Sequence, residues 1–82
     1  MIIIDQAKTI YNGDNIVFVS MQQSTVYEDI WLIMAKLVTG EMVELAAYSS
    51  HDKCKKEFGR YRMALWDEET SYSFGEGYAR DD

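Results

Sequence analysis

Cysteine and histidine each occur once in this 82-residue chain, and proline does not occur at all. A single cysteine cannot form an internal disulfide, so the sequence excludes a small secreted scaffold held together by disulfides. No apolar run approaches the ~18 residues of a membrane-spanning helix, and the N-terminus lacks the cationic and apolar regions of a signal peptide. These absences predict one small soluble domain in the cytoplasm, without a membrane partner.

Basic residues are also few, 8 against 14 acidic ones, which gives a net charge of −6. The charge is uneven along the chain: −5 over residues 1–52, +4 over residues 53–66 and −5 over residues 67–82. The acidic balance argues against direct binding along duplex nucleic acid, because proteins that bind it present a basic surface. Two acidic segments around a basic one can instead steer charged partners.

The first half of the chain has the composition of short β-strands. Residues 2–4 are three consecutive isoleucines, whose β-branched side chains favour a strand. Residues 16–21 alternate two largely apolar sets, which predicts a strand that is central or covered on both faces. Residues 12–15 read Asn-Gly-Asp-Asn and predict a tight turn.

Residues 26–38 fit both a helix and a strand. Helical spacing relates four apolar residues: Val26, Ile30, Ile33 and Leu37. Alternation over residues 31–38 fits a strand equally well. The next residues, Thr39 and Gly40, form a two-residue turn candidate, and residues 41–48 alternate again. A β-hairpin explains both segments and the glycine, so we predict a strand.

An amphipathic helix follows, and it is the clearest element of the sequence. Ser50 is an N-cap candidate, and Asp52 lies in the first turn, where the helix dipole favours an acid. Helical spacing then relates four apolar residues: Cys54, Phe58, Tyr61 and Leu65. We therefore predict an α+β fold: an antiparallel sheet of about four strands with one C-terminal amphipathic helix packed on one face. Residues 1–69 form this domain, and residues 70–82 form an acidic tail that contains aromatic residues.

Three segments carry a family resemblance: Ile-Asp-Gln-Ala-Lys at 4–8, Asp-Asn-Ile-Val at 14–17 and Thr-Gly-Glu-Met-Val-Glu-Leu at 39–45. In these segments the chain resembles a loose group of short proteins from bacterial genomes and prophages. The resemblance implies a β-sheet-plus-helix fold over residues 1–66, and the acidic tail departs from it. In size, acidity and lack of motifs the chain is also similar to phage-encoded anti-defence proteins such as anti-CRISPR inhibitors, although no residue carries that likeness.

Residues suited to catalysis are scarce. His51 and Cys54 lie three residues apart at the predicted helix start, a spacing at which a helix N-terminus and an imidazole can activate a thiolate. We favour the alternative, in which Cys54 belongs to the apolar stripe and His51 faces solvent. With Asp52 they supply at most three ligands, too few for the usual tetrahedral zinc site. We therefore predict no enzyme, no cofactor and no metal.

The basic segment offers a possible nucleic-acid surface, which we weigh against a solvated helix face. Its cations are Lys53, Lys55, Lys56, Arg60 and Arg62. Aromatic residues beside such cations can stack on bases. The acidic flanks would repel phosphates, so we favour a solvated face whose cations pair with those flanks.

The acidic residues suggest a partner of opposite charge. Carboxylates spaced like phosphates can occupy the basic groove of a nucleic-acid enzyme, although they can equally serve only solubility. The main hypothesis is a small non-enzymatic phage or prophage accessory protein that binds and inhibits a host protein, as an anti-CRISPR-type nucleic-acid mimic acting on a nuclease. The predicted contact residues are Asp67, Glu68, Glu69, Tyr72, Phe74 and Glu76.

The alternative hypothesis is a bacterial homo-oligomeric module, such as a homodimer, that has a structural or interaction role. One helix covers one face of a sheet, yet the predicted strands are apolar on both faces, so a second copy would supply cover. The predicted interface residues are Trp31, Met34 and Trp66. Cover by the tail aromatics Tyr72, Phe74 and Tyr78 is the competing explanation.

Overall fold

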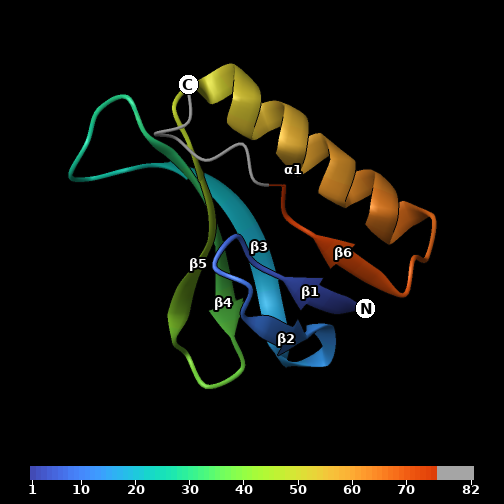
Figure 1. Ribbon diagram of the computed structural model, residues 1–82. Coiled ribbons are helices and arrows are strands. Elements are labelled where there is room, and N and C mark those ends of the chain that lie inside the picture. Colours follow the sequence, from blue (N-terminus) through green and yellow to red (C-terminus); the bar gives the residue numbers. More distant parts are fainter. Residues whose placement is uncertain (76–82) are drawn as a thin grey trace.

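The computed structural model describes residues 1–75 and shows two small sheets and one helix (Figure 1). The elements are β1 (Ile2–Ile4), β2 (Ile10–Asn12), the 3-10 turn η1 (Gly13–Asn15), β3 (Ile16–Gln23), β4 (Trp31–Leu37), β5 (Met42–Tyr48), α1 (His51–Trp66) and β6 (Ser71–Ser73). One sheet has the order β3-β4-β5 and is antiparallel throughout. The other has the order β2-β1-β6, in which β1 is antiparallel to β2 and parallel to β6. The predicted α+β class is confirmed.

The predicted sheet of about four strands is correct only in outline. The structure has two sheets of three strands each, and the predicted C-terminal helix is followed by β6. Three strands, β1, β2 and β6, are only three residues long. The parallel pairing of β1 with β6 joins Ile2 to Ser71, and no local pattern in a sequence reports a pairing at that separation.

The predicted hairpin is confirmed. β4 and β5 pair in antiparallel fashion, and Gly40 in the turn has φ +92°, a conformation that glycine adopts without strain. The strand begins only at Trp31, because residues 26–30 form part of the loop that follows β3. The helical interpretation of residues 26–38 is therefore wrong.

The helix starts where the sequence predicts, but its buried face differs from the predicted apolar stripe. The Ser50 hydroxyl accepts a hydrogen bond from the Lys53 N–H at 3.1 Å and caps α1. The buried residues are Cys54, Glu57, Tyr61 and Ala64. Leu65, the last residue of the predicted stripe, is 48% exposed. The buried face therefore includes Glu57, whose side chain points toward the segment of β6.

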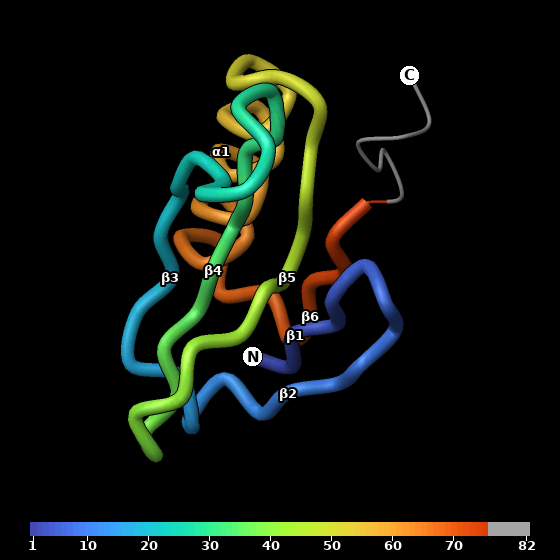
Figure 2. Tube along the Cα trace, turned by 90° about the vertical axis from the view of Figure 1, so that its left-hand side faces the viewer, coloured from blue at the N-terminus to red at the C-terminus, as the bar shows by residue number. Residues whose placement is uncertain are grey.

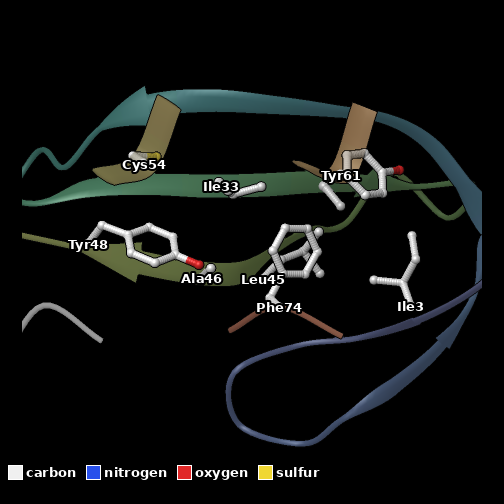
Figure 3. Close-up of a cluster of buried hydrophobic side chains, with 9 residues drawn as sticks. Ile3, Ile33, Leu45, Ala46, Tyr48, Cys54, Tyr61 and Phe74 are labelled. Carbon is white, nitrogen blue, oxygen red and sulfur yellow. The ribbon is translucent and has the colours of Figure 1, made fainter. Parts of the chain in front are cut away.

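One core connects both sheets and α1 (Figure 3). β1 contributes Ile3, β4 contributes Ile33, β5 contributes Leu45, and α1 contributes Tyr61. Phe74, which follows β6, is 1% exposed, and its ring centroid lies 5.5 Å from that of Tyr61. Residues 71–74, assigned from sequence to the tail, therefore form a strand and part of the core.

A second set of side chains lies on the face of the β3-β4-β5 sheet that is opposite α1, as the strand register shows. Phe18 on β3 faces Lys36, and Lys36 faces Met42 on β5. Met34, two residues before Lys36, lies on the same face because side chains alternate along a strand. Figure 2 shows β3, β4 and β5 side by side, with β3 at the outer edge of the sheet.

Candidate functional site

A groove beside the loop between β3 and β4 gathers acidic and apolar side chains. The lining residues are Ser24, Thr25, Val26, Tyr27, Glu28, Asp29, Ile30, Leu32, Glu44 and Ala47. Glu28 and Asp29 come from the loop, whereas Glu44 lies on β5 of the adjoining sheet. None of these lining residues is Lys or Arg. The groove therefore presents three carboxylates without a cation of its own.

Polar contacts within the loop set its shape. The Ser24 hydroxyl accepts hydrogen bonds from the N–H groups of Val26 and Tyr27, both at 3.1 Å. The Gln23 side-chain amide donates to the Glu28 carbonyl at 2.7 Å. A serine hydroxyl that bonds to the backbone two and three residues later stabilises a turn. This turn leaves the side chains of Val26 and Tyr27 exposed to solvent.

The electrostatic environment of Glu44 favours a cation. Partial burial, and then the nearby charge of Asp5, raise the pKa of the Glu44 carboxyl above its usual value. Asp5 is itself buried and accepts hydrogen bonds from the Thr9 N–H at 2.8 Å and the Tyr11 hydroxyl at 3.0 Å. A positive group placed beside Glu44 would offset both effects.

Glu57 carries the most buried charge on α1, and its contacts hold parts of the fold together. Its Oε2 accepts hydrogen bonds from the Tyr72 hydroxyl and, at 3.4 Å, from the Gly75 N–H. Its Oε1 accepts from Arg60 at 3.4 Å. Burial, followed by the hydrogen bond to Glu57, raises the pKa of Tyr72. These contacts fasten the segment of β6 to α1. Sequence reasoning missed Glu57, because its partners come from residues that showed no periodicity.

The thiol of Cys54 is not activated. Its side chain is fully buried, and that burial raises the pKa of the thiol to about 11. A nucleophilic cysteine needs a lowered pKa and access to substrate. The His51 ring stands edge-on to Trp31, with ring centroids 4.6 Å apart, and its Nδ1 lies 3.7 Å from Asp52. Cys54 therefore belongs to the apolar stripe, the alternative that the sequence favoured.

The structure separates the six residues predicted to contact a partner. Asp67, Glu68 and Glu69 are exposed and adjoin one another after the end of α1. Tyr72 is half-buried and bonds to Glu57. Phe74 is 1% exposed, so the structure places its ring inside the core and not on the surface beside the acids. Glu76 lies outside the described residues, as does Tyr78, which was considered as cover for the sheet.

The predicted oligomer residues do not form one surface. Trp31 lies on the α1 face of β4, where it packs against the core and His51. Met34 lies on the opposite face, since residues an odd number apart on a strand point to opposite sides. Trp66 is 84% exposed at the last position of α1. The three residues therefore lie on different parts of the domain, and the homo-oligomer stays a prediction.

Sequence reasoning also missed the groove. The predicted strand over residues 26–38 included Val26, which lies in the loop before β4. Two adjacent acids, Glu28 and Asp29, after an apolar pair were the available signal. The part played by Glu44 depends on the pairing of β4 with β5, which places it opposite Met34.

Fold and surface together define a small α+β domain with an acidic and apolar groove. Within residues 1–75, no helix is long and apolar enough to cross a membrane, and no cluster of three metal-ligating side chains occurs. Comparisons found no matching family model, no matching curated protein and no matching solved structure. The resemblance to short prophage proteins therefore stays a prediction.

Proposed function

We propose that this chain is a non-enzymatic protein-binding domain that holds a basic, partly apolar segment of a partner protein in its groove. The observation that supports this proposal is the groove itself, with three carboxylates and no Lys or Arg among its lining residues. Opposite charge on a partner would accelerate association and select against acidic competitors.

A lysine or arginine side chain suits the groove better than a small cation. Its aliphatic stem would lie along Val26 and Leu32, and its charged head would reach the carboxylates. The exposed ring of Tyr27 adds a surface on which a cation can rest. The groove therefore favours a segment in which basic and apolar side chains occur together.

A titration followed by NMR tests this proposal with a defined probe, a short peptide of alternating lysine and leucine. We expect shift changes concentrated at residues 24–30 and at Leu32, Glu44 and Ala47. The double variant E28K/D29K should weaken binding roughly tenfold or more, because it reverses two of the three charges. Shift changes spread evenly over the surface would contradict the proposal.

Two controls separate a specific site from general charge attraction. A peptide with glutamate in place of lysine should not bind at the groove. The double variant D14K/E41K changes the net charge by the same amount as E28K/D29K but alters residues that do not line the groove. It should leave the affinity for the lysine peptide nearly unchanged at moderate salt.

The narrower proposal is that the partner is a nucleic-acid enzyme which the chain inhibits by mimicry. It draws support from the exposed acids Asp67, Glu68 and Glu69 at the C-terminal end of α1. The helix dipole disfavours carboxylates at this end, and Glu68 adopts φ +56°, which is unfavourable for a residue with a side chain. Acids in this position do not favour stability, which supports a role for them in binding.

Calorimetric titration against a candidate nuclease over a range of salt concentrations tests this narrower proposal. Mimicry predicts that binding weakens steeply as salt rises and that the triple variant D67K/E68K/E69K loses inhibition. A circular dichroism spectrum matching the wild type would show that the variant folds. Inhibition that does not depend on salt would rule out mimicry.

A further inference from the structure

β3 forms an open edge of its sheet. Among the strands of residues 1–75 its only neighbour is β4, and Figure 2 shows it on the outside of the β3-β4-β5 sheet. The Ser24 N–H donates to the Ile30 carbonyl at 2.8 Å, which identifies residues 24 and 30 as a hydrogen-bonded pair. Because such pairs alternate along an antiparallel ladder, Val19, Met21 and Gln23 direct their backbone groups away from β4. Among the described residues, these outward groups have no hydrogen-bond partner.

This edge lacks the features that normally prevent strands from pairing with one another. Residues 16–23 contain no charged residue and no proline. Charged side chains and prolines are the usual protection of an exposed edge. A bulge between Ile16 and Phe18 distorts only the first residues, so residues 18–23 form a regular edge.

A depression between the start of this edge and α1 would receive the side chains of an added strand. Its lining includes residues 16–19 of β3 and Phe58 and Leu65 of α1, together with the charged residues Asp14 and Arg62. Val17 on β3 and Leu65 on α1 are exposed beside this depression, and Phe18 is exposed on the face of the sheet opposite α1. These three apolar side chains would be covered by a neighbour at the edge.

We propose that a second copy of this chain occupies the edge, so that two β3 strands pair in antiparallel fashion about a two-fold axis and join two three-stranded sheets into one. Charge permits this occupant at the edge, although it opposes contact elsewhere on the surface. The chain carries a net charge of −6, so two copies repel one another over most of their surface, whereas residues 16–23 are uncharged. This proposal rests on β3 alone and does not depend on the acidic groove.

The outward groups are self-complementary at one register. With the axis at Met21, each Met21 pairs with its counterpart, and Val19 of one copy pairs with Gln23 of the other. Both residues of each pair then direct their N–H and C=O groups toward the partner strand, as a hydrogen-bonded antiparallel pair requires.

A proline substitution tests the edge without breaking the ladder to β4. Gln23→Pro removes an outward N–H and places a ring at the edge, where proline is tolerated in a folded sheet. Gln23→Ala is the matched control, since it removes the same side chain but keeps the N–H. Light scattering at micromolar concentration should show dimers for the wild type and Gln23→Ala. The dissociation constant of Gln23→Pro should rise roughly tenfold or more.

Two outcomes would overturn this proposal. One is a wild-type chain that stays monomeric throughout the micromolar range, and the other is equal association of Gln23→Pro and Gln23→Ala. As a further probe, a synthetic peptide of residues 16–23 can be added to the chain. If the wild type is monomeric and this peptide slows hydrogen exchange at Val19, Met21 and Gln23, the edge accepts foreign strands, and the dimer is excluded. Unchanged circular dichroism of Gln23→Pro would confirm that the variant folds.

Discussion

The hydroxyl of Tyr72 donates a hydrogen bond to the buried carboxylate of Glu57, and this contact joins β6 to α1. A buried carboxylate that loses a donor retains its desolvation cost without compensation. The pair therefore holds the last described strand in place, and its strength is measurable through single-atom changes.

Tyr72→Phe removes only the hydroxyl. We expect it to lower the free energy of unfolding by about 1–3 kcal/mol, because among residues 1–75 Glu57 then keeps only its longer contacts with Arg60 and Gly75. Urea denaturation measures the change. Tyr27→Phe is the matched control, since Tyr27 is 67% exposed, and it should change stability by less than about 0.5 kcal/mol. Equal effects of the two variants would contradict a role for the contact.

Tyr48→Phe should have the opposite sign. The Tyr48 hydroxyl is buried and has no hydrogen-bond partner among the described residues. Removing an unsatisfied buried hydroxyl is neutral or stabilising, by up to about 1 kcal/mol. Thermal unfolding followed by circular dichroism tests this expectation. A marked loss of stability would show that the hydroxyl has a partner in solution.

Two glycine-to-alanine changes should differ in sign. A Cβ at Gly59 on α1 would meet no atom within 4 Å, so Gly59→Ala should add up to about 1 kcal/mol of stability through helix propensity. A Cβ at Gly13 would lie 2.4 Å from the Met1 carbonyl oxygen. Gly13→Ala should therefore cost about 1–3 kcal/mol, as overpacking does. Denaturant titration of both variants provides the comparison, and a stabilised Gly13→Ala would contradict the close approach.

Glu44→Gln should stabilise the fold in a pH-dependent way. Partial burial and Asp5 raise the pKa of Glu44, so the folded chain holds this proton more tightly than the unfolded chain does. The resulting stability is present in acid and is lost as pH rises through the raised pKa. Near neutral pH, Glu44→Gln should therefore be more stable than the wild type, and in acid the two should converge. Urea midpoints at both pH values measure this, with Glu41→Gln as an exposed control.

The same variant tests the proposed function. Because Glu44 is one of the three groove carboxylates, Glu44→Gln should bind the lysine-leucine peptide more weakly even though it is more stable at neutral pH. If Glu44→Gln is more stable but binds the peptide as tightly as the wild type, Glu44 does not belong to the proposed site. The raised pKa of Glu44 would still be supported by the gain in stability.

The elements that depend on neighbouring residues were predictable. The hairpin followed from the alternation on both sides of Gly40, and the helix start followed from Ser50. The stripe on α1 was half correct, since Cys54 and Tyr61 are buried but Leu65 is exposed. A periodicity argument assigns the most hydrophobic face of a helix to the core, so it could not place Glu57 inside. The Glu57 carboxylate is buried there because the Tyr72 hydroxyl donates a hydrogen bond to it.

The remaining errors come from contacts between distant residues. A three-residue strand such as Ser71–Ser73 has too little sequence to show alternation, and its partner β1 lies near the other end of the described chain. The groove has the same origin, because Glu44 meets Glu28 and Asp29 only after the sheet has formed. Local patterns therefore predicted the β4-β5 hairpin and α1, but not how the second sheet closes on them.

The position of β1 between β2 and β6 also orders events during synthesis. Ile3 is translated before its parallel neighbour Tyr72 and the core ring of Phe74, and a helix and four strands lie between them in the sequence. On the ribosome, β1 must therefore wait with an unsatisfied edge while β3, β4, β5 and α1 emerge. The core of the described residues is therefore completed only after Phe74 has emerged, and a nascent chain halted before residue 74 would leave Ile3 exposed.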